Sequence, residues 1–104
     1  MKIDFKKGNN LIPVIIQDYQ DKSVLMLGFT NRQAYHMTEK TAEVYLYSRK
    51  NKKLWHKGAT SGNILKLKKM LLDCDGDTLI YQVALQGKFV CHLKRKSCFE
   101  TVQG

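Results

Sequence analysis

The chain has 104 residues, of which 43% are hydrophobic and 26% charged, and its 18 Lys and Arg against 9 Asp and Glu give a formal net charge of +9. This composition predicts one soluble globular domain over residues 1–104 and excludes low complexity and disorder. The apolar runs are far shorter than the roughly 18 residues of a membrane span, and the charged N-terminus lacks a signal-peptide pattern. The charge attracts polyanions, which are nucleic acid, phosphorylated metabolites or an anionic membrane surface. We expect a cytoplasmic protein without a membrane partner.

The first elements in chain order are a predicted hairpin and a helix. Apolar and β-branched residues at 14–17 and 24–29 predict two strands, joined by the polar turn at 18–23. Thr30 and Gln33 have the spacing of a capping box, which predicts a helix that begins there and runs to about Lys40. Alternating side chains at 43–48 predict a third strand.

A basic stretch at 49–57 and a loop at 58–63 precede the last predicted strands. Residues 64–72 fit both a strand and a helical face, and the lysines at every second position favour the strand. Further strand signals lie at 78–85, with a turn at 86–88 and short extended pieces at 89–91 and 98–102. Five to seven strands and one or two helices give an α+β domain with a mixed or antiparallel sheet. We expect a dimer to cover the edges of that sheet.

Three of the nine acidic residues lie within five positions, at Asp73, Asp75 and Asp77. On extended backbone these carboxylates would point to one side and Cys74 to the other. Clustered carboxylates stay ionised when a cation lies between them, and hard oxygen ligands suit Mg²⁺. A solvated acidic turn is the alternative.

Three cysteines, Cys74, Cys91 and Cys98, form the second cluster, and their odd number argues against a disulfide framework. Thiolates with the imidazole of His92 favour Zn²⁺, with His92, a water or a substrate as fourth ligand. Three protein ligands and an open position are typical of catalytic zinc. Isolated buried thiols are the alternative. The sequence also lacks the paired CxxC spacing that would strengthen the zinc interpretation.

The loop at 58–63 follows Trp55 and His56, and its backbone N–H groups could cradle a phosphate, although on its own the pattern favours a plain turn. Basic residues before this loop and near the C-terminus strengthen the interpretation that the protein binds an anion. They are Arg49, Lys53, Lys57, Lys94 and Arg95.

Taken in order, these pieces resemble the phosphoribosyl-AMP cyclohydrolase family over about residues 10–100. The matching stretches include LWHKGATSG at 54–62, DCDGD at 73–77, CH at 91–92 and SCF at 97–99. The resemblance implies a hydrolase of histidine biosynthesis that opens the adenine ring of N1-(5-phosphoribosyl)-AMP at the N1–C6 bond. Where the family's loop reads Gly-Glu-Thr-Ser-Gly, this chain has Ala59 in place of the glutamate.

The resemblance also implies the site. It implies Mg²⁺ on Asp73, Asp75 and Asp77, and Zn²⁺ on Cys74, Cys91 and Cys98, with zinc ligands drawn from both subunits of a homodimer. His92 is the candidate fourth ligand or proton shuttle, with His56 in reserve. The predicted substrate and phosphate contacts are Arg49, Lys53, Trp55, Lys57, Gly58, Thr60, Ser61, Gly62, Lys94 and Arg95.

Two other functions explain part of the pattern. A small basic zinc-binding module for nucleic acid accounts for the charge and the thiols, with Trp55 as a stacking surface. The aspartates beside Cys74 would repel a phosphate backbone, which argues against that module. A structural zinc domain would require four closed ligands around the metal.

Overall fold

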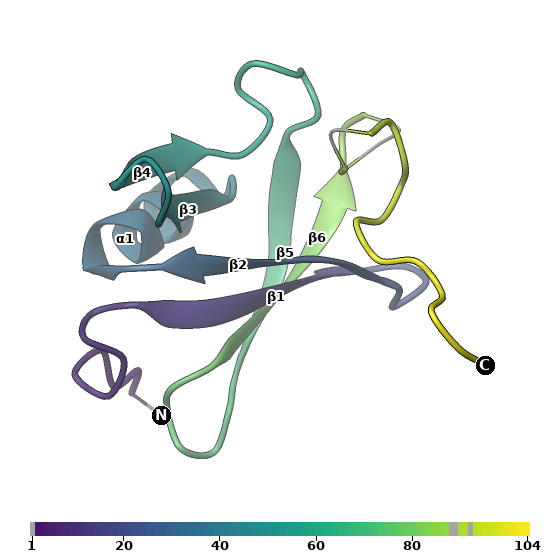
Figure 1. Cartoon of the computed structure of the whole chain (residues 1–104). Helices are drawn as coiled ribbons and strands as arrows, with labels where there is room; N and C mark the ends of the chain where they lie inside the picture. Colours follow the sequence, from purple (N-terminus) through teal and green to yellow (C-terminus); the bar gives the residue numbers. More distant parts are fainter. Residues whose placement is uncertain (1, 88–89, 92) are drawn as a thin grey trace.

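The computed structural model describes residues 2–87, 90–91 and 93–104 (Figure 1). Within these residues the chain forms six strands and one helix. In order they are β1 (Ile12–Asp18), β2 (Val24–Thr30), α1 (Arg32–Thr41), β3 (Tyr45–Ser48), β4 (Lys53–His56), β5 (Leu65–Leu72) and β6 (Leu79–Leu85). The expected α+β class is confirmed. No helix of the described residues is long and apolar enough to cross a membrane.

The main sheet has four strands in the order β2-β1-β6-β5. It is mixed, because β1 pairs with β2 antiparallel and with β6 in parallel, whereas β5 and β6 form an antiparallel hairpin. A second sheet consists of the β3–β4 hairpin, which lies beside α1 and β2 (Figure 1). The parallel β1–β6 pair therefore joins the first and last strands at the centre of the fold.

Side-chain alternation explains the strands. On β1, Ile12, Val14 and Ile16 are fully buried, and they meet buried residues of β6 such as Tyr81 in the core. On β5, Leu65 is buried while the lysines at 68 and 69 are exposed, so the strand prediction for this segment is confirmed. The pairing register of β5 with β6 shifts between Leu67 and Lys69.

The helix begins one residue later than predicted. Asn31, not Thr30, is the N-cap, and its side chain accepts a hydrogen bond from the Ala34 N–H at 2.8 Å. Thr30 is the buried last residue of β2, where it pairs with Ile12, so it is unavailable as a cap. At the other end the helix stops at Ala42, which has a left-handed conformation.

Two further predictions differ from the structure. The basic stretch contains a strand that its composition hides, β4, which pairs with β3. Residues 98–102 form no strand, and the start of this segment is instead fixed by a hydrogen bond from the Cys98 N–H to the Leu25 carbonyl at 2.7 Å. The predicted turn at 86–88 and extended piece at 89–91 lie partly outside the described residues.

The loops gather at two ends of the main sheet. The β5–β6 turn lies near the N-terminal segment, whereas the loop at 58–63 and the segment after β6 lie at the other end (Figure 1). At that second end Gly87 approaches Asn63 so closely that a Cβ on Gly87 would overlap the Asn63 amide. Each end carries part of the predicted site.

Candidate functional site

The acidic cluster occupies the β5–β6 turn. The Asp73 N–H donates to the Thr78 carbonyl at 2.9 Å, and the Gly76 N–H donates to the Asp73 carbonyl at 2.8 Å. The ligand atoms of Asp73, Cys74 and Asp75 all lie within 4.8 Å of one another and are exposed. The expectation that Cys74 points away from the aspartates is therefore wrong, because the backbone turns here instead of staying extended.

Asp77 lies outside that group of three, half-buried, with its carboxylate 3.5 Å from the Thr78 hydroxyl. Carboxylate oxygens of Asp73 and Asp75 form a hard donor set that suits Mg²⁺, and the Cys74 sulfur beside them adds a softer donor. The turn can thus contribute ligands to two kinds of metal.

The N-terminal segment holds this turn in place. The Asp4 N–H donates to the Gly76 carbonyl at 2.6 Å, and Lys7 Nζ donates to the Asp75 carbonyl at 2.8 Å. Gly76 has a φ of +75°, and a Cβ there would lie 2.8 Å from the Lys2 carbonyl oxygen. Contacts from the N-terminal segment therefore fix the carbonyls of Asp75 and Gly76 in this turn.

The other two cysteines lie at the opposite end of β6. Cys91 is buried, and its sulfur accepts a hydrogen bond from the Leu93 N–H at 3.5 Å. Partial burial raises the pKa of the Cys98 thiol, the neighbouring Cys91 raises it further, and the ammonium of Lys57 acts in the opposite direction. Two adjacent sulfur atoms, one already accepting a backbone N–H, form a donor set that fits Zn²⁺.

Cys74 does not join this pair within one chain. It precedes β6, Cys91 follows it, and the seven residues of that strand span about 20 Å. The structure therefore brings Cys91 and Cys98 together and keeps the Cys74 of the same chain apart. His92, the candidate fourth ligand, lies outside the described residues.

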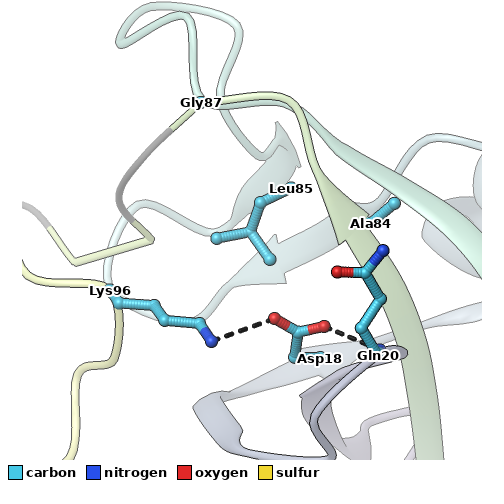
Figure 2. Close-up of a pocket in the computed structure, with 6 residues that line it drawn as sticks. All are labelled: Asp18, Gln20, Ala84, Leu85, Gly87 and Lys96. Carbon is cyan, nitrogen blue, oxygen red and sulfur yellow. Dashed lines mark hydrogen bonds and ion pairs between the residues drawn. The ribbon is translucent and has the colours of Figure 1, made fainter.

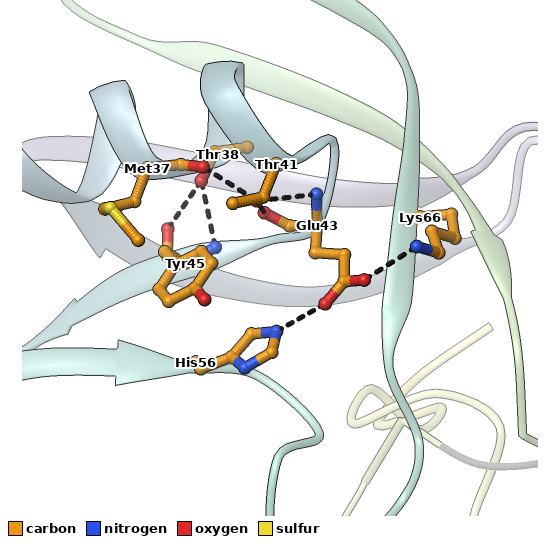
Figure 3. A network of polar contacts seen from close by, with 7 residues as sticks. All are labelled: Met37, Thr38, Thr41, Glu43, Tyr45, His56 and Lys66. Atoms are coloured by element: carbon orange, nitrogen blue, oxygen red, sulfur yellow. Dashed lines mark hydrogen bonds and ion pairs between the residues drawn. The ribbon is translucent and has the colours of Figure 1, made fainter.

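His56 belongs to a polar network that the sequence did not reveal (Figure 3). Its Nε2 lies 2.8 Å from Glu43 Oε1, and Lys66 Nζ donates to Glu43 Oε2 at 2.6 Å. The His56 ring stacks on Tyr45 with a centroid distance of 4.2 Å. Hydrogen bonds from Lys66 and then His56 lower the pKa of Glu43. Because Glu43 and Lys66 are distant in sequence, only their pairing across the β5 edge makes this network visible.

The predicted cations occupy different environments. The Arg49 guanidinium lies 3.9 Å from the centre of the Phe29 ring, and Arg49 and Trp55 line a cavity of about 260 Å³ between β2 and the β3–β4 hairpin. Lys53 is exposed on β4. Lys57 is buried, donates to the Val90 carbonyl at 2.8 Å, and has its pKa lowered by that burial.

The loop at 58–63 is a tight turn in which the Gly62 N–H donates to the Gly58 carbonyl at 2.8 Å. Thr60 and Ser61 are exposed on it. The remaining two predicted cations are exposed beyond Cys91: Lys94, whose N–H donates to the Cys91 carbonyl, and Arg95, which pairs with Glu100 at 2.8 Å. The loop, Lys57 and the thiol pair therefore lie at the same end of the sheet.

Fold and site together define a small α+β domain with candidate metal ligands at both ends of one central strand. The sequence model of the phosphoribosyl-AMP cyclohydrolase family matches residues 26–100. The chain belongs to this family, whose members are hydrolases of histidine biosynthesis.

Curated relatives match nearly the whole chain. Phosphoribosyl-AMP cyclohydrolase of Clostridium botulinum (strain 657 / Type Ba4) is 47% identical, over 96% of this chain and 90% of its own length. The protein of the same name from Streptococcus sanguinis (strain SK36) is 46% identical, over 95% of this chain and 86% of its own. The histidine biosynthesis bifunctional protein HisIE of Buchnera aphidicola subsp. Schizaphis graminum is 50% identical over 95% of this chain, which spans 47% of that longer protein.

Proposed function

We propose that this chain hydrolyses N1-(5-phosphoribosyl)-AMP, adding water at C6 of the adenine ring and breaking the N1–C6 bond to give the phosphoribosyl-formimino imidazole carboxamide ribotide. Ribosylation at N1 makes the ring cationic and C6 electrophilic. The proposal rests on family membership and on the Cys91–Cys98 thiol pair beside Lys57 and the loop at 58–63.

The metals are part of the same proposal. Cys91 and Cys98 of one subunit and Cys74 of a second subunit would hold Zn²⁺ in a homodimer, and Asp73, Asp75 and Asp77 would hold Mg²⁺. The separation of Cys74 from the other thiols within one chain supports sharing between subunits. Zinc, when bound, lowers the pKa of water and so makes a nucleophile available near neutral pH.

The chain's own residues would bind the substrate and move protons. His92 is the candidate for proton transfer or for the fourth ligand position, and His56 is the reserve, with Glu43 orienting its ring. The substrate contacts proposed are those that the sequence predicts, and the cavity lined by Arg49 and Trp55 is one place for the ribotide. The net charge of +9 would attract a substrate with two phosphates, in the cytoplasm as we expect.

Ultraviolet absorbance tests the reaction directly. The purified protein, loaded with Zn²⁺ and supplied with Mg²⁺, is incubated with N1-(5-phosphoribosyl)-AMP beside a chelator-treated control. We expect a chelator-sensitive spectral change as the purine becomes an imidazole carboxamide. A folded, zinc-loaded protein that leaves the spectrum unchanged would contradict the proposal and direct attention to Ala59.

A further inference from the structure

Lys96 ties the C-terminal segment to the β1–β2 hairpin (Figure 2). Its Nζ lies 3.1 Å from Asp18 Oδ2 and also pairs with Asp21. Asp18 ends β1, is 8% exposed, and receives a second hydrogen bond from the Gln20 N–H at 2.8 Å. Asp18 therefore offers Lys96 an anchor at the end of a regular strand, and Asp21 adds a second carboxylate from the β1–β2 turn.

The neighbours of Lys96 carry the thiol pair. On one side the Arg95 carbonyl accepts a hydrogen bond from the Cys91 N–H at 3.1 Å. On the other, the Ser97 hydroxyl donates to the Val24 carbonyl at 2.7 Å, and the Cys98 N–H donates to Leu25. Residues 95–98 thus connect both thiols to β2, although they form no regular strand themselves.

We propose that the ion pairs of Lys96 with Asp18 and Asp21 form a clasp that positions Cys91 and Cys98 for Zn²⁺. Lys96 is then a positioning residue that touches no metal, and the inference rests on the zinc site of the proposed function. The physical reason is preorganisation, since a segment without ladder hydrogen bonds needs other anchors to keep two sulfur atoms together. Loss of such an outer-shell contact typically weakens metal binding about 10- to 100-fold.

The clasp makes a prediction that a merely stabilising ion pair does not. Removing Lys96 takes one partner from the buried Asp18 carboxylate, so Tm should fall whether or not the ion pair acts on the zinc site. Only the clasp also predicts a fall in zinc affinity. Lys68 provides the matched control, because it is an exposed lysine on β5, at the opposite edge of the sheet from β2.

The experiment measures Zn²⁺ affinity by competition with a chromophoric chelator, and Tm in parallel, on the full chain. We expect Lys96→Met, measured well below its Tm, to bind zinc about tenfold more weakly than Lys68→Met, and Lys96→Arg to bind like the wild type. Equal zinc affinities of Lys96→Met and Lys68→Met would overturn the clasp.

Two more variants keep the outcome decisive. If Lys96→Met does not fold, the double variant Asp18→Asn with Asp21→Asn removes both carboxylates from the other side. Zinc affinity equal to that of Lys68→Met would then overturn the clasp in the same way. Cys91→Ser tests the zinc site itself. Wild-type zinc affinity in that variant would refute the proposed site, whereas a loss there with unchanged Lys96→Met refutes the clasp alone.

Discussion

Cys91 and Asp75 distinguish the two proposed metals, because they lie at opposite ends of β6. We expect Cys91→Ser to lose zinc and activity, by more than the about 100-fold that loss of an outer-shell contact can cost. Asp75→Asn should lose activity and keep its zinc. Metal content by mass spectrometry, beside the absorbance assay, measures both. Loss of zinc from Asp75→Asn would contradict the two-metal arrangement.

Glu43 makes stability depend on pH. Its contacts with Lys66 and His56 lower its pKa from the ordinary 4.5, so the ionised form stabilises the fold. This contribution is fully present above the ordinary pKa and is lost as pH falls through the lower folded value. Glu43→Gln should therefore have a lower Tm than the wild type at neutral pH, and the difference should shrink in acid.

The control for this measurement is Glu39→Gln, on the exposed side of α1, where the carboxylate lies 3.8 Å from His36. We expect a smaller change in Tm for this variant. A Tm difference between Glu43→Gln and the wild type that stays constant from neutral to acidic pH would show that the network does not hold Glu43 ionised.

The candidate site was predictable only where ligand chemistry is local. Asp73, Cys74 and Asp75 adjoin in sequence, and the structure brings their ligand atoms together. The direction of the Cys74 side chain was mispredicted, because it depends on the β5–β6 turn. Contacts with the N-terminal segment fix that turn. The pairing of Glu43 with Lys66, and of Lys96 with Asp18, was not predicted, because only folding brings these partners together.

At the scale of elements, the β5–β6 turn needs its glycine for two separate reasons. Gly76 has positive φ, and its missing Cβ makes room for the Lys2 carbonyl. Gly76→Ala should destabilise the protein by about 1 kcal/mol or more in urea unfolding. Gly62→Ala is the matched control, because Gly62 has a φ of +80° and a Cβ added there would meet nothing within 4 Å. Equal destabilisation of the two variants would mean that the N-terminal segment does not pack on the turn.

Strand and helix predictions succeeded where side-chain periodicity is strong. Lysines interleave with Leu65 and Leu67 at the start of β5, where Leu65 is buried, and this pattern correctly favoured a strand over a helix. β4 has four residues and pairs only with β3 in the sheets described. Because so short a strand gives a weak alternation of side chains, its basic composition dominated the prediction. The piece at 98–102 carries an apolar and aromatic pattern, yet its start is fixed by Ser97 and Cys98 contacts with β2 and not by a ladder.

At the scale of the whole molecule, sharing of ligands predicts complementation between two inactive variants. Each proposed zinc site combines Cys74 of one subunit with Cys91 of the other. A mixture of Cys74→Ser and Cys91→Ser, assembled together, should regain about a quarter of wild-type activity, because half of the dimers are heterodimers with one intact site of two. Native mass spectrometry counts the heterodimers, and heterodimers without activity would contradict sharing.

The parallel β1–β6 pair has a consequence for synthesis of the chain. Ile15 pairs with Ile80, so the centre of the sheet closes only after most of the chain has left the ribosome. Until then the β1–β2 hairpin has an open inner edge, and its apolar residues lack the partner that finally covers them. Such late, non-local closure slows folding and leaves a nascent chain open to aggregation, so the last strand to be translated is the one that completes the domain.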